Sequence, residues 1–172
     1  MKFTRPLQVV LKAAIVLLPW SLKRPALQCL FGYELDPGAR IGLAWIFPQR
    51  LTMAFGSRIS SFCVAIHLDL LELGELASIG RGNWITGFAS GTSSRHFAHQ
   101  VSRRSQLHLG AHSAITKYHH IDATNCITIG PFTTIAGYRS QLLSHSIDLQ
   151  RNIQHSEPIT IGAYCFVGTG CV

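Results

Sequence analysis

Charged residues are scarce in this chain of 172 residues: they make up 13% of the sequence, whereas ordinary soluble domains contain about 25%. Hydrophobic residues make up 47%, which excludes disorder, and the low charge excludes a long solvated coiled coil. The 15 glycines follow no three-residue period, which excludes collagen, and five cysteines are an odd number for a disulfide-stapled miniprotein. We therefore expect one folded domain with reduced, cytosolic thiols.

Acidic residues are absent from residues 1–33. The cations of this segment are Lys2, Arg5, Lys12, Lys23 and Arg24. Apolar residues from Leu7 to Leu18 follow helical spacing, and Pro19 is expected to end or kink the helix. The apolar stretch is shorter than the roughly 20 residues of a bilayer crossing, and no small-residue cleavage site follows it. We therefore expect residues 1–35 to form a short, retained helical segment.

Two interpretations of this cationic segment remain open. An apolar helix flanked by Lys and Arg can lie in the headgroup region of an anionic membrane, where each nearby cation contributes about 1 kcal/mol. Alternatively, the helix packs on the rest of the protein. The net charge of +7 favours an anionic partner without choosing among nucleic acid, phosphorylated cofactors and acidic lipid. We expect a cytoplasmic protein, with peripheral contact at the inner face of the membrane as the open alternative.

From Ile41 onward the main signal is an aliphatic residue followed by glycine, and the aliphatic residues recur every six positions. The residues in phase are Leu73, Ile79, Ile85, Leu109, Ile115, Ile121, Ile127, Ile129, Ile135, Ile161 and Val167. A helix spaces apolar residues by threes and fours and a strand by twos, so neither period fits. A period of six fits a solenoid coil with three short flat sides, on each of which the aliphatic residue points inward and glycine permits the turn. The sequence predicts an all-β fold, a parallel β-helix over residues 36–172.

Small residues stand four positions after several of the aliphatic ones, where a second inward position lies near a corner. They are Ala77, Ser113, Thr133, Cys165 and Cys171. We accordingly expect Cys126, Cys165 and Cys171 to be core thiols. A β-sandwich with turn glycines competes with the solenoid, but it requires an alternation that the sequence lacks. Residues 88–106 and 142–158 break the period, and we expect both to be loops ejected from corners, where binding groups gather.

Several stretches resemble the hexapeptide-repeat acyltransferases, and particularly the sugar O-acetyltransferases of polysaccharide biosynthesis. The matching stretches are Phe31-Gly32-Tyr33-Glu34 leading into Ala39-Arg40-Ile41-Gly42, Ile79 to Gly87, His119-His120-Ile121-Asp122, and ITIGPFTTIAGYRSQLLSHSID from Ile127 to Asp148, followed by ITIGAYCFVGTG. This resemblance implies a left-handed coil, against the usual right-handed crossover. It also implies a homotrimer with sites between subunits, and acetyl-CoA as acyl donor. Family members continue past the position of Val172, so we expect either missing coils with part of the cofactor site, or another element over the last coil.

The resemblance also suggests the chemistry. Related enzymes use a histidine that projects from a coil as general base in direct transfer, and His145 lies in the matching segment. Imidazole suits this task because its pKa lies near neutrality. Backbone N–H groups of a neighbouring coil would stabilise the oxyanion. Either Asp148 or Glu157 would orient the ring, and the sequence does not choose between them.

The other candidate site residues fall into three groups. Those for the sugar acceptor are His119, Asp122, Asn83 and Trp84, of which Trp84 equally suits corner packing. Those for acetyl-CoA are Gly137, Gly168 and Thr169. Arg95, Arg103 and Arg104 either pair with phosphates or belong to a solvated basic loop. No metal is expected.

Two other functions remain as alternatives to an acetyltransferase. The same fold can hold a zinc carbonic anhydrase with three histidines from adjacent subunits, but the expected ligand spacing is not clean here, since neighbouring His119 and His120 should point to opposite faces. A non-catalytic paralogue or scaffold would keep the coils and lack the cofactor site. Nucleic-acid binding is disfavoured because the cations are dispersed and not interleaved with aromatic residues, and P-loop, Rossmann and Ser-His-Asp signatures are absent.

Overall fold

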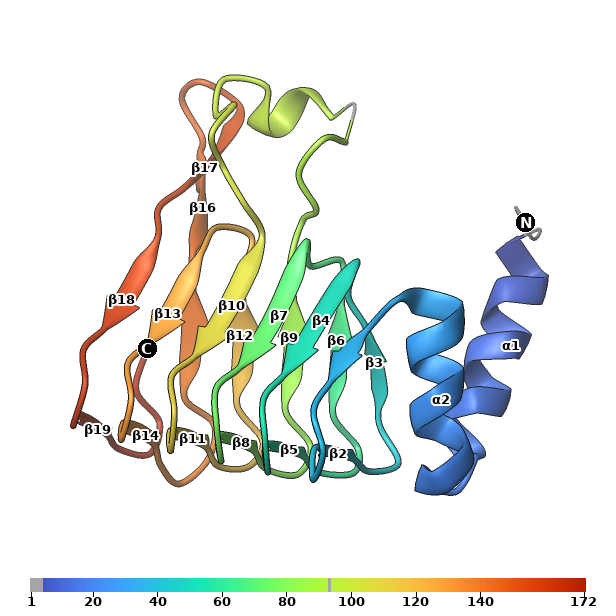
Figure 1. Ribbon diagram of the computed structural model, residues 1–172. Coiled ribbons are helices and arrows are strands. Elements are labelled where there is room, and N and C mark those ends of the chain that lie inside the picture. The colour runs from blue at the N-terminus through green and yellow to red at the C-terminus, as the bar shows by residue number, and fades with distance from the viewer. Residues whose placement is uncertain (1–4, 93) are drawn as a thin grey trace.

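The six-residue period of aliphatic residues closes into a triangular solenoid, preceded by two helices (Figure 1). The computed structural model describes residues 5–92 and 94–172. Lys2 lies outside the described residues. The helices are α1 (Arg5–Leu17) and α2 (Trp20–Phe31), and Pro19 separates them as expected. α2 ends at Gly32, which adopts the left-handed conformation (φ 67°) and donates its N–H to the Gln28 carbonyl, a common helix stop.

Each side of the triangle is a parallel sheet built from strands of successive coils. Sheet A consists of β1 (Glu34–Leu35), β4 (Arg50–Met53), β7 (Leu70–Leu73), β10 (Gln106–Leu109), β13 (Ile127–Ile129) and β18 (Ile159–Ile161). Sheet B consists of β2 (Arg40–Ile41), β5 (Arg58–Ile59), β8 (Ser78–Ile79), β11 (Ala114–Ile115), β14 (Thr134–Ile135) and β19 (Phe166–Val167). Sheet C consists of β3 (Trp45–Phe47), β6 (Val64–Ile66), β9 (Trp84–Thr86), β12 (His120–Asp122) and β15 (Gln141–Leu143).

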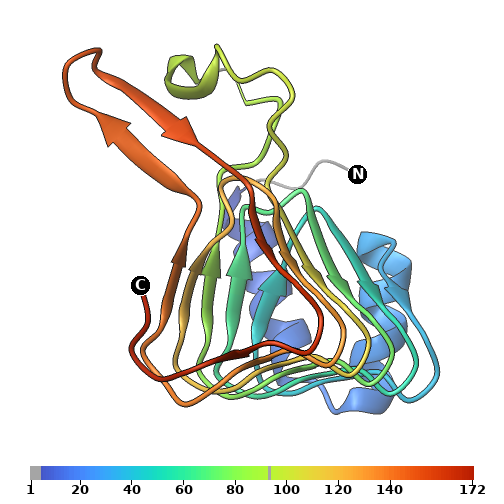
Figure 2. The ribbon, with the colours of Figure 1, turned by 90° about the vertical axis from the view of Figure 1, so that its left-hand side faces the viewer.

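The coils stack in register, so that inward residues form columns along the axis. In sheet A, Leu71 pairs with Leu51 on one side and Leu107 on the other, and Leu107 pairs with Ile127. These side chains are fully buried and form the core. Seen from the C-terminal end, the chain runs clockwise while advancing toward the viewer, so the coil is left-handed (Figure 2). The predicted left-handed parallel β-helix is confirmed.

The aliphatic-glycine pairs are explained by the close approach of successive coils at the corners. A Cβ atom added to Gly74 would lie 2.7 Å from the backbone nitrogen of Ala111, and one added to Gly110 would lie 2.5 Å from that of Pro131. Real Cβ atoms essentially never come so close to backbone, so a side chain at these positions would force the coils apart. Glycine at this corner is required by stacking.

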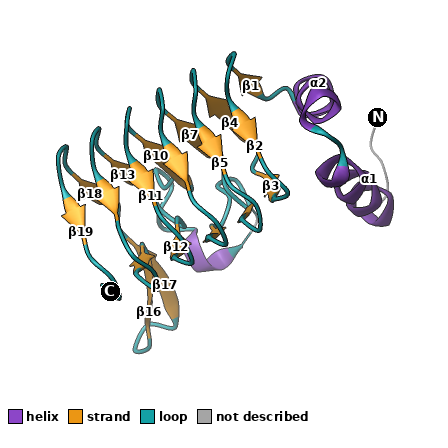
Figure 3. Cartoon of the chain, turned by 90° about the horizontal axis from the view of Figure 1, so that it is seen from below, coloured by secondary structure: helices purple, strands orange, loops and turns teal. Residues whose placement is uncertain are grey.

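The two helices cover the N-terminal end of the solenoid (Figure 3). Ile15 of α1 and Leu27 of α2 are buried in the same core cluster as Tyr33 and Ile46 of the first coil. The interpretation that this segment packs on the rest of the protein is therefore confirmed. Neither helix in the described part of the chain is long and apolar enough to cross a bilayer.

Both interruptions of the period leave the solenoid at the same corner, where sheet C passes into sheet A (Figure 2). The first carries a short 3-10 helix, η1 (Arg95–Phe97). The second is an antiparallel hairpin of β16 (His145–Asp148) and β17 (Ile153–Ser156). Leu142 and Leu143 belong to β15, so this insertion starts later than the predicted residue 142.

The prediction that Cys126, Cys165 and Cys171 are core thiols is wrong. Cys171 is exposed, while Cys126 and Cys165 are only partly buried. No further coil of the described chain packs over the coil that contains Cys165, so small residues of this last coil stay open to solvent. The buried thiol is that of Cys63, whose sulfur donates to the Gly80 carbonyl and whose pKa is raised by burial.

The stacked core makes a prediction about stability. Replacing Leu71, which is fully buried, by Ala should lower the free energy of unfolding by about 2–5 kcal/mol, because a cavity forms between two coils. Leu22→Ala on the exposed side of α2 is the matched control and should change it by no more than about 0.5 kcal/mol. Urea unfolding followed by circular dichroism measures both, and equal effects would contradict the assigned core.

Candidate functional site

The candidate site lies at the corner between sheets C and A, where the hairpin leaves the solenoid. Asp122 ends β12, and β15 runs beside it with Leu143 in register. Two residues later His145 begins β16, and its Nδ1 atom contacts the Oδ2 atom of Asp122. This contact is the main feature of the site.

Asp122 is held in place by hydrogen bonds that do not involve the imidazole. Its other carboxylate oxygen, Oδ1, accepts hydrogen bonds from the Thr124 N–H at 3.0 Å and the Thr124 hydroxyl at 2.6 Å. The backbone carbonyl of Asp122 accepts from the Ser144 hydroxyl at 2.7 Å, and Ser144 in turn accepts from the Asn125 N–H. The carboxylate side chain is only 10% exposed. These bonds fix both the carboxylate and the residue that precedes His145.

The arrangement gives the two nitrogens of His145 different roles. A carboxylate that faces Nδ1 favours the tautomer with the proton on that atom. The Nε2 atom is then the proton acceptor. The His145 side chain is partly exposed, so a substrate hydroxyl can reach it. A histidine held in this way can act as a general base.

Neither carboxylate that was expected to orient the ring is placed to do so. Asp148 lies near the tip of the hairpin, where Oδ1 accepts from the backbone N–H groups of Gln150 and Arg151. Glu157 faces the other hairpin histidine, His155, with Oε1 2.8 Å from Nε2. Strand geometry explains the first correction, because residues three apart on a strand point to opposite faces. The carboxylate that contacts the His145 ring is that of Asp122, which the sequence suggested only as a sugar-binding candidate.

His119 and Asn83 do not line a cleft as expected, because both are buried at the corner between sheets B and C. The Asn83 amide donates to the carbonyls of Gly80 and Thr116, at 2.9 and 2.7 Å, and its oxygen accepts from the His119 N–H. His119 Nδ1 accepts from the Ser140 N–H, and Nε2 lies 3.0 Å from the Thr116 hydroxyl. Their polar groups are engaged between coils, so both residues hold the corner together.

Trp84 is not packed into a corner. Its side chain is exposed on the outer face of sheet C, where it pairs in register with His120. His120 is exposed as well, whereas its neighbour His119 is buried, so the two do point to opposite faces.

The cofactor candidates are brought together, but at a different corner from His145. Thr169 lies so close to Gly137 that a Cβ atom on this glycine would overlap the Thr169 side chain. The Gly168 carbonyl accepts from the Ser140 hydroxyl at 2.9 Å. All three residues lie in the turns that lead from sheet B toward sheet C, so within one chain they do not form a single pocket with His145.

Arg103 fits neither sequence-based expectation, since it neither lies in a solvated basic loop nor is free to bind phosphates. It is buried, donates to the Thr124 carbonyl at 2.6 Å and to the Phe88 carbonyl, and its guanidinium lies 4.5 Å from the centre of the Phe97 ring. Burial lowers the pKa of this arginine, against the opposing effect of the Asp69 carboxylate. Arg103 therefore anchors the first projecting loop and is not available for phosphates, whereas Arg95 and Arg104 are exposed.

A hollow of about 520 Å³ lies between the first loop and the base of the hairpin. Arg104, Asn125 and Glu157 are among its polar lining residues. His145 does not line this hollow, but Ser156, its partner in the hairpin register, does. The site thus combines a fixed histidine with an adjacent cleft that has charges of both signs.

Comparison of the chain with protein-family models, curated proteins and solved structures finds no match. Within the residues that the structure describes, no three His, Cys, Asp or Glu side chains are grouped so that they could hold a metal ion. The site is therefore interpreted from its own geometry.

The buried His119 predicts a pH dependence of stability. Desolvation by burial lowers the pKa of His119 in the folded protein. The unfolded chain then binds a proton near pH 6.5 that the folded chain resists, so this contribution is present above pH 6.5 and is lost as the pH falls.

Replacing His119 by Gln should therefore flatten the loss of unfolding free energy between pH 7 and pH 5, as measured by urea titrations at each pH. His120→Gln, at the exposed neighbour, is the control and should keep the slope of the wild type. An unchanged slope in the His119 variant would contradict a neutral buried imidazole.

Proposed function

We propose that this chain is a left-handed β-helix acyltransferase that moves an acetyl group from acetyl-CoA to a hydroxyl of a sugar or glycan precursor. The observation that carries the proposal is the contact between His145 Nδ1 and the buried carboxylate of Asp122. It leaves Nε2 of a partly exposed imidazole as the proton acceptor. The hexapeptide resemblance of the sequence supplies the substrate class.

The proposed reaction is a direct transfer. His145 Nε2 takes the proton of the acceptor hydroxyl as its oxygen attacks the thioester carbonyl, which forms a tetrahedral oxyanion. Collapse of this intermediate breaks the carbon–sulfur bond, and the imidazolium returns the proton to the departing thiolate. Asp122 stabilises the imidazolium between these two steps without taking its proton. Backbone N–H groups of a neighbouring coil are the proposed donors to the oxyanion.

The proposal includes a homotrimer with sites between subunits. Both projecting segments carry strongly exposed apolar side chains, Val101 on the loop and Ile147 and Leu149 on the hairpin. Apolar groups that project from a rigid frame gain free energy when another surface covers them. A neighbouring copy would also bring a second corner to His145, so that residues of the Gly137 and Thr169 corner could approach the thioester. The net charge of +7 favours the polyanionic cofactor.

The His145 assignment is tested by kinetics. His145→Ala should lower acetyl transfer by about 10²–10⁴-fold, the usual contribution of a general base, without changing the melting temperature. The assay incubates the full chain with acetyl-CoA and a panel of sugar nucleotides and lipid-linked sugars and detects the acetylated product by mass spectrometry. His120→Ala, at an exposed histidine outside the site, is the matched control and should keep the wild-type rate. Retained transfer by the His145 variant would remove this residue from the mechanism.

Equilibrium binding of acetyl-CoA separates catalysis from a scaffold function. Wild type and His145→Ala should bind the cofactor with similar affinity, because His145 is given a chemical role and no binding role. A wild-type chain that binds no acetyl-CoA in a calorimeter would favour the non-catalytic scaffold instead.

A further inference from the structure

The two N-terminal helices have an unusual distribution of polarity. The exposed side chains of α1 include Leu7, Val10 and Leu17, and Val10 and Leu17 are 64% and 75% exposed. On α2, Leu22 and Leu30 are exposed as well. From residue 6 to residue 31, where side-chain exposure is described, no charged residue is among the exposed ones. Helices that face water normally show the opposite pattern.

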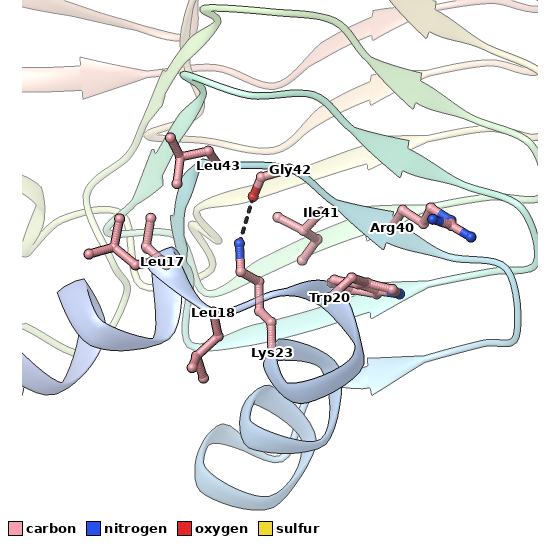
Figure 4. A pocket seen from close by; sticks show the side chains of 9 residues that line it. Leu17, Leu18, Trp20, Lys23, Arg40, Ile41, Gly42 and Leu43 are labelled. Carbon is pink, nitrogen blue, oxygen red and sulfur yellow. Dashed lines mark hydrogen bonds between the residues drawn. The ribbon is translucent and has the colours of Figure 1, made fainter.

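The cations of these helices point toward the solenoid instead. Lys23 is only 5% exposed, and its Nζ atom donates to the Gly42 carbonyl at 2.9 Å (Figure 4). Arg24 donates to the Leu35 carbonyl at 2.8 Å. Lys12 Nζ lies 4.9 Å from the centre of the Phe47 ring. Burial lowers the pKa of both Lys12 and Lys23. The cations thus help to attach the helices, and the aliphatic side chains are left outside.

We propose that the outward face of α1 and α2, defined by Leu7, Val10, Leu17, Leu22 and Leu30, docks on the surface of an anionic lipid bilayer. An aliphatic helix face of this kind buries itself at the boundary between headgroups and acyl chains and lies in the plane of the membrane. This orientation agrees with the length of the helices, which are too short to cross a bilayer. The inference is independent of the reaction proposed at His145.

The composition of the face favours a bilayer over a protein partner. Its large exposed side chains are all aliphatic, whereas the centres of protein interfaces are enriched in aromatic residues, Met and Arg. The exposed polar residues between residues 6 and 31 are Gln8, Ser21, Gln28 and Cys29, which are few to hold a protein partner in one fixed orientation. A fluid hydrocarbon surface requires no fixed orientation.

The charge of the segment complements anionic headgroups. Residues 1–33 contain no acidic residue, so no negative charge in this segment opposes an anionic surface. At the border of the face, a hollow of about 330 Å³ is lined by Leu17, Leu18 and Trp20 together with the cationic residues Lys23 and Arg40 (Figure 4). Of these two cations only Arg40 is exposed, and it is the group that would meet the lipid phosphates.

The test is co-sedimentation of the full chain with vesicles. Wild type should bind vesicles of phosphatidylcholine with phosphatidylglycerol, bind pure phosphatidylcholine vesicles more weakly, and lose affinity as salt is added. The double variant Val10→Asp with Leu17→Asp should bind anionic vesicles at least tenfold more weakly, because two side chains that enter the bilayer become charged. Leu76→Asp with Phe166→Asp, at exposed apolar positions of the middle and last coils, is the matched control and should bind like wild type.

Two further measurements keep the outcome decisive. The melting temperature shows whether the helix variant folds, and Leu22→Asp on α2 replaces it if it does not. Light scattering without lipid reports the oligomeric state. Wild type that ignores anionic vesicles, or a folded helix variant that still binds them, would overturn the proposal. If the helix variant instead breaks an oligomer that binds no lipid, the face is a contact between copies and the bilayer is excluded.

Discussion

The in-register stacking of coils is the constraint on which the rest of the structure depends. Backbone hydrogen bonds join each strand to the same strand of the next coil, so Leu71, Leu107 and Ile127 must stand in one column. A coil cannot gain residues within a side without breaking all three columns. Any additional residues must therefore leave at a corner and return to the same register. Gly74 and Gly110 show how tight this stacking is, since neither has space for a Cβ atom.

This constraint explains why the candidate site lies where it does. Both insertions leave at the corner between sheets C and A, so residues distant in sequence come together there. Gln100 of the first loop bonds to the backbone and side chain of Ser156 in the hairpin, and Ser156 stands opposite His145. The stack fixes Asp122 in β12, and the following coil places His145 in contact with it. A rigid frame with two projecting segments thus orients the imidazole without a dedicated domain.

The sequence predicted the frame well and the site only in part, for physical reasons. The six-residue period identifies Ile79, Ile85 and Ile115 as inward residues, because burial in a solenoid follows local spacing, and all three are buried. The partner of His145 depends on which coils become neighbours and on how the hairpin leaves the frame. The spacing of residues in the sequence indicates neither of these, so on spacing alone Asp148 was a better candidate partner than Asp122. The register of the strands does indicate the partner, because pairing His120 with Gln141 places Asp122 beside Leu143 and close to His145.

The roles of individual polar residues were the hardest feature to predict. Asn83, His119 and Arg103 are of types that are common in binding sites, yet in the structure they form hydrogen bonds with backbone groups at corners and loops. A solenoid needs such residues because its corners leave carbonyl groups unpaired between strands. The N-terminal helices follow the same rule, since Lys23 and Arg24 satisfy carbonyls of the first coil. Because these cations attach the helices on their inner side, the outer face of the helices can remain aliphatic, and this is the face for which a membrane contact is proposed.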